Sequence, residues 1–249
     1  MEATAVRRWV DAFPVVQDEW SHELVGCRST RLRTSASGEG RLWGSLQART
    51  QLRHLETLTE HVTVIGSSAA VPQGFQRHHN MCEITYAYEF ARERLSAGNL
   101  PLPVKVECMP ESARAAVEAL SAYFLQRYQH LWSFTVPPPA RGRCAAPESP
   151  LIPFQRLCLG GIQISLATAN VKRDVHVDSD GLGDVITTFV VYGSGVVLLE
   201  AVTGLERAEE NLVYGEFYGI YGEQRWWVKH GVTSGPDGRG SLTLRYFFS

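Results

Sequence analysis

Residues 239–248 have the sequence RGSLTLRYFF, and this stretch decides which fold the chain can adopt. Successive side chains of a β-strand point to opposite faces. One face of this strand is therefore polar, with Arg239, Ser241, Thr243 and Arg245, and the other is apolar, with Leu242, Leu244, Tyr246 and Phe248. We expect the apolar face to pack under helices. Two guanidinium groups are costly to bury without anionic partners, so the polar face predicts a site for an anion.

The motif His176-Val177-Asp178 lies upstream of that strand and offers two metal ligands. Residues two apart on a strand share a face, so this imidazole and this carboxylate can meet at one ion. His230 is the best candidate for a third ligand, 54 residues later (230 − 176), at the end of a strand on which Trp226 and Val228 share its parity. Two histidines and one carboxylate form the facial triad of non-haem Fe(II) sites, which leaves coordination positions open.

A His-x-Asp pair alone is weak evidence for a metal site, because it often arises by chance. The strand that begins nine residues after His230 (239 − 230) strengthens the prediction, since its polar face points the same way as the metal ligands. A guanidinium can hold a carboxylate through two parallel hydrogen bonds. Arg239 is therefore predicted to grip a dicarboxylate such as 2-oxoglutarate.

The part of the chain after Pro153 has the character of β-strands. Its β-branched and apolar stretches are separated by short glycine-containing breaks. Gly193-Ser194-Gly195 predicts a hairpin, and Gly222 marks a second turn. The strands expected from this pattern span residues 154–169, 185–192, 196–200, 213–220, 225–230 and 241–248.

The part before Pro153 is helical and irregular. A mixed helical pattern covers residues 81–95, and a stronger helix opens at Pro110, with an apolar stripe of Val117, Leu120, Phe124, Tyr128 and Leu131. Residues 29–44 are expected to form a loop, and six prolines make residues 137–153 a connector. We therefore predict a helical and loop region, residues 1–150, that packs on a β-rich core, residues 151–249. The fold class is α+β, with a sandwich or barrel buttressed by N-terminal helices.

Composition limits the partners of the chain. It has 249 residues, of which 44% are hydrophobic and 20% are charged, so a large core is possible. A net charge of −2 argues against binding polyanions over the whole surface. The segment 21–54 nevertheless carries six arginines against Glu23 and Glu39, which makes it net +4. Such a segment can meet phosphates, although a solvated surface is the ordinary alternative.

Cysteine spacing and hydropathy indicate the compartment. The five cysteines include no CxxC pair, so neither a disulfide framework nor a structural zinc site is predicted. Residues 1–18 lack the pattern of a signal peptide, and no apolar run is long enough to span a membrane. We expect an intracellular protein, nuclear or cytoplasmic, that does not associate with a membrane and is a monomer.

Four segments taken in order resemble a known enzyme family. They are HVD at 176–178, GEFYG at 215–219, HGV at 230–232 and RGSLTLR at 239–245. This order is similar to that of double-stranded β-helix (jelly-roll) oxygenases that act on nucleic acids, namely the AlkB-like demethylases and the TET/JBP-like oxidases of methylated pyrimidines. The resemblance covers residues 154–248. Residues 1–150 show no motif of this kind.

The resemblance implies a role for each matching residue. His176, Asp178 and His230 would be the Fe(II) ligands, and Arg239 would bind the distal carboxylate of 2-oxoglutarate. Arg245 would lie near the other carboxylate of 2-oxoglutarate or near the iron-bound aspartate. Asn170 and Ser241 stand at further co-substrate positions of the AlkB-like pattern, with Ser241 in place of an asparagine. One type of TET-like enzyme uses ascorbate, so ascorbate is an alternative co-substrate.

The substrate is less sharply indicated than the chemistry. Lys172 occupies the place of a tyrosine in the AlkB-like pattern, which favours the TET/JBP-like branch, although the cysteine-rich zinc region of animal TET enzymes is lacking. The favoured hypothesis is oxidation of a methyl group on a nucleic-acid base. The favoured base is 5-methylcytosine, and DNA is preferred to RNA as the substrate. The alternatives are an AlkB-like N-alkyl demethylase, or a hydroxylase of a small molecule or a protein side chain. A non-catalytic cupin-like binding module is disfavoured, because it has no need of Arg239.

Several other features have ordinary structural explanations. A metal cluster at His78, His79 and Cys82 lacks a fourth ligand at convincing spacing. His54 and His61 are expected on a solvated helix face. At least one of Trp226 and Trp227 is expected in the core, and the other could wall the pocket. Asp180 is as well explained by capping a turn as by binding substrate.

Overall fold

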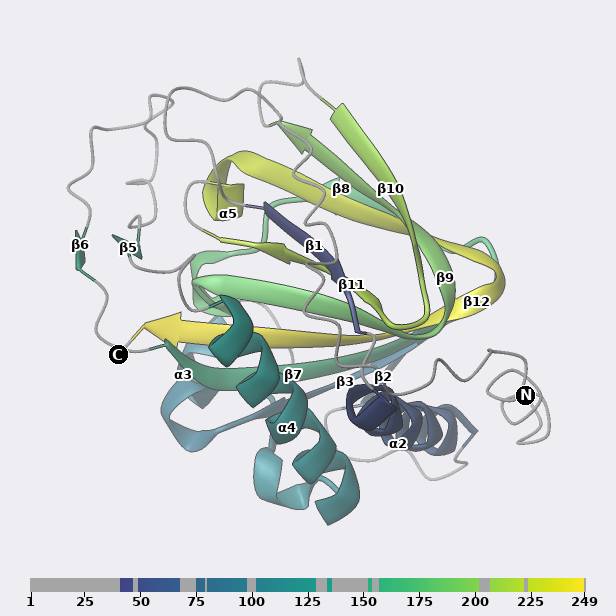
Figure 1. Ribbon diagram of the computed structural model, residues 1–249, viewed down its shortest axis with the longest axis horizontal. Coiled ribbons are helices and arrows are strands. Elements are labelled where there is room, and N and C mark those ends of the chain that lie inside the picture. Colours follow the sequence, from purple (N-terminus) through teal and green to yellow (C-terminus); the bar gives the residue numbers. More distant parts are fainter. Residues whose placement is uncertain are drawn as a thin grey trace.

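A single curled sheet dominates the computed structural model, which describes residues 41–46, 49–67, 75–78, 80–97, 102–128, 134–135, 152–153, 157–201, 207–221 and 224–248. The sheet has ten strands, and helices cover one side of it (Figure 1). Its main path runs through β1 (Arg41–Ser45), β11 (Glu216–Ile220), β9 (Val185–Ala201), β12 (Val228–Phe248), β7 (Leu157–Ala167), β3 (Met81–Ala87) and β2 (Phe75–His78). Three more strands attach to this path, namely β10 (Arg207–Val213) to β9, β4 (Val104–Lys105) to β3 and β8 (Lys172–His176) to β12.

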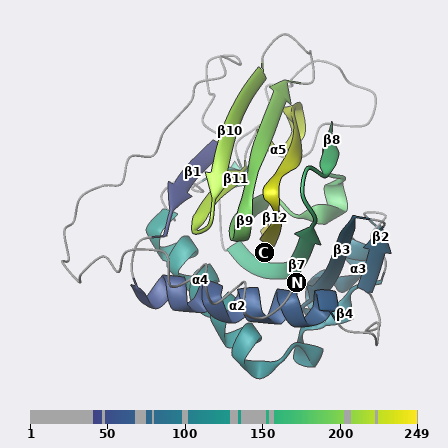
Figure 2. The ribbon, with the colours of Figure 1, turned by 90° about the vertical axis from the view of Figure 1, so that its right-hand side faces the viewer.

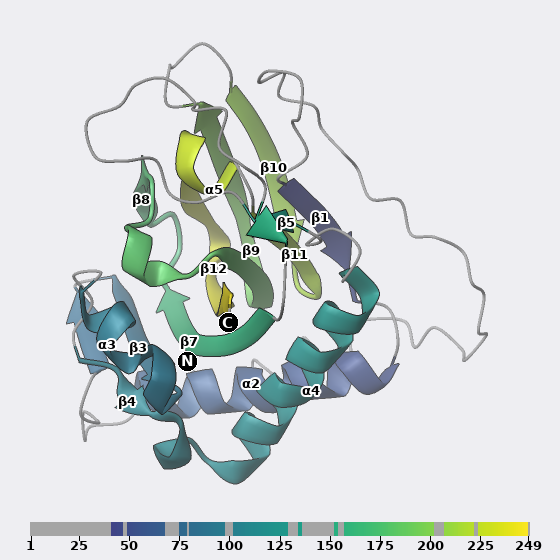
Figure 3. The same ribbon diagram turned by 90° about the vertical axis from the view of Figure 1, so that its left-hand side faces the viewer.

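The remaining elements are helices and one small sheet. The helices are α2 (Arg49–Ser67), α3 (Glu89–Ala97), α4 (Glu111–Tyr128) and the single turn α5 (Gln224–Trp227), with 3-10 turns η1 (Val106–Cys108) and η3 (Asp180–Leu182). Strands β5 (Phe134–Thr135) and β6 (Ile152–Pro153) pair with each other. Helices α2 and α4 contact each other beneath the curled sheet (Figures 2 and 3). Within these described ranges, no helix has the length and apolarity that a membrane crossing needs.

The main core lies between the helices and the apolar face of β12. Leu242, Leu244 and Tyr246 are fully buried there, as the alternation of residues 239–248 predicted. The aromatic ring of Phe124, from the predicted stripe of α4, stacks on Tyr246 with centroids 5.7 Å apart and meets Phe217 edge-on at 5.8 Å. The predicted helix after Pro110 and the predicted apolar strand face are therefore confirmed, and together they give the α+β architecture.

Strand β12 carries an irregularity that decides which residues share its inner face. His230 and Arg239 are nine residues apart (239 − 230), so an unbroken strand would point them to opposite faces. Against β9, the pairing passes from Ser234 with Gly195 directly to Arg239 with Gly193. Five steps along β12 thus match two along β9, and Gly238 takes φ +86° inside the bulge. This bulge returns His230 and Arg239 to the same side of the sheet.

Three predictions about strands are wrong. The hairpin expected at Gly193-Ser194-Gly195 does not form, because both flanking halves pair with β12 and the chain runs straight on as β9. The last strand begins at Val228 rather than Ser241, and His230 lies inside it rather than at its end. The strand expected at residues 213–220 begins only at Glu216, because the chain reverses at Tyr214-Gly215, where Gly215 adopts φ +85°.

Two helical boundaries also differ from the predictions. Residues 81–87, expected in a helix, form β3, because this segment pairs with β7 along its whole length. Local periodicity carries no signal of such a distant partner. Residues 225–227, expected in a strand, belong to the single turn α5, which spans Gln224–Trp227.

Residues of the predicted N-terminal region contribute to the same sheet as the predicted core. Strands β1, β2, β3 and β4 all belong to the ten-stranded sheet. The boundary near residue 150 remains a prediction, because residues 136–151 lie outside the described ranges. Residues 29–40 of the expected loop also lie outside the described ranges, whereas residues 41–45 form β1.

Candidate metal centre

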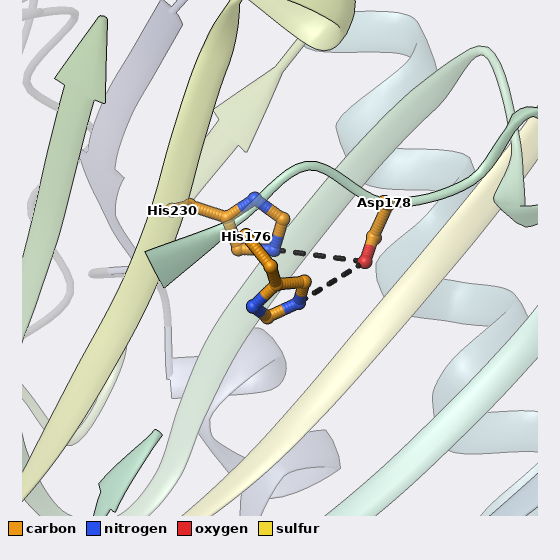
Figure 4. A group of neighbouring side chains, drawn as sticks. All are labelled: His176, Asp178 and His230. Atoms are coloured by element: carbon orange, nitrogen blue, oxygen red, sulfur yellow. Dashed lines mark ion pairs between the residues drawn. The ribbon is translucent and has the colours of Figure 1, made fainter. Parts of the chain in front are cut away.

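Three predicted metal ligands meet at one end of β12. Each of His176, Asp178 and His230 offers a ligand atom, and these atoms lie within 4.8 Å of one another (Figure 4). The two imidazole centroids are 4.6 Å apart, and Asp178 Oδ1 lies 3.3 Å from His176 Nε2 and 3.9 Å from His230 Nε2. Pairing of His176 with His230 across β8 and β12 brings the rings together. The predicted convergence is confirmed, although Asp178 lies two residues beyond the end of β8.

Glycine at position 231 allows the two histidine strands to approach. The β8–β12 ladder is irregular between His230 and Val232, where two steps along β12 match three along β8, so β8 carries a bulge at this point. A Cβ on Gly231 would lie 2.8 Å from the Arg173 carbonyl oxygen and 2.9 Å from a Val175 methyl. Any larger residue would push β8 away, and His176 with it.

The Asp178 carboxylate is held in one orientation by a buried arginine. Arg245 Nη1 lies 2.8 Å from Asp178 Oδ2, which leaves Oδ1 facing the two imidazole rings. Burial alone would raise the pKa of the Asp178 carboxyl, but Arg245 together with His176 holds it well below its usual range. The group is therefore an anion with one oxygen directed at the metal position.

The two histidines differ in exposure but are both suited to coordination. Burial lowers the pKa of His230 to about 4, so this imidazole is neutral and keeps a lone pair. His176 is partly exposed, and its hydrogen bond with Asp178 raises its pKa. The Nδ1 atom of His176 lies 2.9 Å from the Asp174 carbonyl oxygen. An Nδ1–H donating to that carbonyl leaves Nε2 for a metal, as in many metal-bound histidines.

The donor set fits Fe(II). Two imidazole nitrogens and one carboxylate oxygen occupy one side of an ion and leave the rest open to small molecules. Within the described ranges, this is the one group of three or more histidine, cysteine or acidic side chains close enough to hold a metal. The cluster weighed at His78, His79 and Cys82 is not such a group in the part that the structure describes.

The metal ligands open into a pocket of about 710 Å³, counting its mouth. The polar face of β12 forms part of its wall through Arg239, Ser241, Thr243 and Arg245, as the sequence predicted. Thr188 and Tyr218 line it from β9 and β11, and the Thr188 and Thr243 hydroxyls are 2.9 Å apart.

Arg239 is a buried cation in this pocket with donors left over. The residue is only 7% exposed, and its Nε and Nη2 atoms have no hydrogen-bond partner among the described residues. Burial lowers the pKa of Arg239 from its usual value. An unpaired buried guanidinium is costly unless an anion joins it. The carboxylate of 2-oxoglutarate has the charge and the planar geometry that this group requires.

Two glycines of β9 make room for Arg239, a feature that sequence analysis did not find. A Cβ on Gly195 would lie 2.7 Å from Arg239 Cδ and 2.9 Å from the Thr233 carbonyl oxygen. A Cβ on Gly193, which has φ +64°, would lie 2.1 Å from the Gly238 carbonyl oxygen. The Gly193-Ser194-Gly195 segment therefore accommodates the β12 bulge and the arginine rather than forming a hairpin.

A chain of polar contacts leads from Asp178 to the pocket mouth. Arg245 Nη2 donates to Gln163 Oε1 (2.9 Å), and Gln163 Nε2 donates to Glu83 (3.2 Å). Glu83 in turn pairs with Arg173 at 2.8 Å. Among the lining residues, Arg173 is the cation that reaches solvent, since its side chain is 37% exposed while Arg239 and Arg245 are buried. The charge of Arg173 is already neutralised by Glu83.

Other predicted residues lie elsewhere. Asn170 sits in an exposed turn with φ +58°, and it is not among the pocket-lining residues.

Trp226 is buried and belongs to the core, as expected for at least one of the tryptophans, while Asp180 is exposed at the start of η3. Nothing is described for the side chain of Trp227. Arg28, Arg31 and Arg33 lie outside the described residues.

Comparisons with known proteins identify the fold. No family model and no curated protein sequence matches the chain. A Pseudomonas putida prolyl-4-hydroxylase structure is similar over 83% of this chain and 91% of its own, with 11% identity and a TM-score of 0.50. The structure of OsALKBH1 is similar over 83% of this chain and 97% of its own, with 14% identity and a TM-score of 0.48. The likeness to the prolyl-4-hydroxylase structure confirms the predicted α+β fold with a double-stranded β-helix core.

Proposed function

We propose that the chain is an Fe(II)- and 2-oxoglutarate-dependent oxygenase. The observation that carries this proposal is that one pocket holds both the His176, Asp178 and His230 triad and the buried guanidinium of Arg239, whose Nε and Nη2 atoms have no partner among the described residues. A binding module of the same fold gains nothing from a buried, unpaired cation beside three metal ligands. An enzyme whose co-substrate is a dicarboxylate needs one.

Each residue of the site has its own proposed role. His176, Asp178 and His230 would hold Fe(II), and Arg239 would hold the distal carboxylate of 2-oxoglutarate, with Ser241 beside it on the same face. Arg245 would keep Asp178 oriented, because its Nη1 and Nη2 atoms bond to Asp178, Leu182 and Gln163. Bound iron, 2-oxoglutarate and O₂ supply the oxidation of a substrate C–H group to an alcohol, with succinate and CO₂ as co-products.

Metal and co-substrate binding test this proposal directly. Under anaerobic conditions, the protein should bind one Fe(II) per chain and develop a visible charge-transfer band when 2-oxoglutarate is added. His176→Ala, Asp178→Ala and His230→Ala should each remove the band while circular dichroism remains unchanged. Retention of stoichiometric iron by all three variants would refute the triad. A wild type that turns over with ascorbate but not with 2-oxoglutarate would refute the co-substrate.

For the substrate, we propose a methyl group on a nucleic-acid base, with 5-methylcytosine in DNA favoured and an AlkB-like N-alkyl base as the alternative. The support is the order of motifs in residues 154–248 and the net +4 charge of residues 21–54. A base must leave the duplex to enter such a pocket, and phosphate contacts hold the strand meanwhile. Arg28→Ala, Arg31→Ala and Arg33→Ala together should weaken duplex binding at every sequence and lower the salt slope by up to about three. The same triple variant should oxidise a free methylated nucleoside as well as the wild type does.

A small-molecule or protein substrate has its own support in the pocket mouth. A nucleic-acid enzyme needs free cations around the opening, whereas Arg173 is paired with Glu83. Mass spectrometry of digested methylated DNA and RNA, after incubation with the enzyme, separates these possibilities. An added oxygen on 5-methylcytosine supports the favoured substrate. If both nucleic acids stay unmodified while a metabolite or peptide is hydroxylated, a small-molecule or protein substrate replaces the favoured one.

A further inference from the structure

Arg225 is a buried arginine that the proposed chemistry does not use. It lies in α5, at the same end of β12 as β8 (Figures 1 and 3), and its side chain is fully buried. Its guanidinium stacks on the ring of Trp226 at 4.4 Å. No ion pair of Arg225 occurs within the described ranges, so its hydrogen-bond partners must explain why it is buried.

All three nitrogens of the Arg225 guanidinium donate to main-chain carbonyl oxygens of one loop. Nη1 donates to Asp178 (2.9 Å), Nη2 to Ser179 (2.8 Å) and Nε to Gly183 (2.8 Å). The first two carbonyls begin the loop that contains η3, and the third ends it. One planar group therefore ties both ends of the loop together.

That loop carries the carboxylate ligand. Asp178 lies beyond the end of β8, so no sheet pairing fixes its backbone. Arg245 orients the Asp178 side chain, and Arg225 grips the Asp178 carbonyl from the main-chain side. Burying a guanidinium without a carboxylate partner costs free energy of folding. This cost favours a specific role for Arg225 that depends on its three hydrogen bonds to the loop. A lysine could not reproduce it, because an ammonium lacks the planar fork.

We propose that Arg225 is a positioning residue that fixes the 178–183 loop, so that the Asp178 carboxylate is in place before a metal arrives. The inference rests on the proposed metal centre and adds a residue that touches neither metal nor co-substrate. Without Arg225, the Asp178 carboxylate keeps its ion pair with Arg245, but its backbone gains freedom that metal binding must remove again.

Co(II) binding by the full-length protein tests this role, since Co(II) reports coordination through its visible spectrum. Arg225→Met should weaken Co(II) binding at least tenfold and alter the spectrum, in line with the usual effect of residues that orient metal ligands. Hydrogen exchange of metal-free protein should become faster at the Leu182 and Asp184 amides, which bond to Ser179 and Tyr246. Arg92→Met is the matched control, because Arg92 Nε also donates to a carbonyl, that of Pro103, away from the pocket.

The outcomes separate the inference from the proposed function. Wild-type Co(II) affinity and unchanged exchange in a folded Arg225→Met protein would overturn the role of Arg225 and leave the metal centre standing. A wild type that binds no Co(II) would overturn both. An equal loss of affinity in Arg92→Met would assign the effect to general destabilisation and overturn the inference. If Arg225→Met does not fold, Arg225→Lys decides, with reduced Co(II) affinity expected and wild-type affinity as the contrary result.

Discussion

The Arg245 Nη1 atom lies 2.8 Å from the Asp178 Oδ2 atom, and each of the two side chains is only 6% exposed. The same arginine also donates to the Leu182 carbonyl oxygen and to Gln163. Asp178 is thereby fixed as an anion with one oxygen left for a metal. An arginine at one end of β12 thus controls a metal ligand that belongs to a different part of the chain.

Replacing Arg245 should damage both stability and metal binding. Arg245→Ala leaves the Asp178 carboxylate buried and unpaired, which costs about 3–5 kcal/mol of unfolding free energy. Iron or cobalt affinity should fall roughly 10- to 100-fold, because the carboxylate loses its orientation. Urea denaturation and metal titration measure the two effects. An Arg245→Ala protein with wild-type metal affinity would show that Asp178 needs no such partner.

Replacing Arg239 should have opposite effects on the free and the co-substrate-bound protein. Arg239→Met removes a buried cation whose Nε and Nη2 donors lack partners among the described residues, so the melting temperature without ligand should stay equal or rise. The 2-oxoglutarate requirement should increase by roughly 30-fold or more, as expected for a lost charge-assisted pair of about 2–5 kcal/mol. Thermal shift assays with and without 2-oxoglutarate measure both. Arg173→Met, in the same pocket, is the control and should keep the 2-oxoglutarate-induced shift; a shift retained by Arg239→Met would remove the anchor role.

A methyl group on Gly195 should weaken co-substrate binding without touching the metal. The new Cβ would lie 2.7 Å from Arg239 Cδ, so Gly195→Ala displaces the guanidinium. We expect KM for 2-oxoglutarate to rise roughly tenfold or more, on the order of 1.4 kcal/mol, with iron stoichiometry unchanged. Gly160→Ala is the matched control, because its Cβ would meet Phe247 at 2.5 Å outside the pocket. That variant should lose stability and keep its KM, and equal KM changes in both would contradict the argument.

Stability should depend on pH through His61. This residue is half-buried and its Nε2 lies 3.5 Å from the Tyr86 hydroxyl, rather than on a fully solvated face as expected. Burial lowers the pKa of His61 below 6.5. Between that lowered pKa and 6.5 the unfolded chain binds the extra proton, so stability rises with pH, and it is lost as pH falls through this window. Denaturation of His61→Gln from pH 7 downward should show a shallower slope than wild type, and an identical slope would assign the pH dependence to other groups.

The site was more accessible to sequence reasoning than the strand boundaries. Metal ligands and the arginine strand face follow from residue type and short spacing, which depend little on the rest of the fold. The continuity of β9 through Gly193-Ser194-Gly195 depends on its pairing with β12, a partner far away in the chain. Glycines there look identical whether they turn a hairpin or clear space for Arg239, so local sequence cannot separate the two.

Arg225 escaped sequence reasoning for a related reason. Its three acceptors are main-chain carbonyls, which every residue possesses, so no residue type in the 178–183 loop signals the contact. The strand expected at residues 225–230 also placed Arg225 in the wrong element. A strand pattern interrupted by a single helical turn shows no distinct periodicity over four residues.

The bulge of β12 makes the length of residues 235–238 matter more than their composition. Deleting or inserting one residue there would invert the two faces of the strand after it, turning Arg239 and Arg245 toward the helices and Leu242 and Leu244 toward the candidate metal ligands. During evolution this segment should therefore change by substitution rather than by insertion or deletion. Substitution is also restricted at Gly238, which has φ +86°, and at Gly235, where an added Cβ would lie 2.1 Å from Ser194 Oγ.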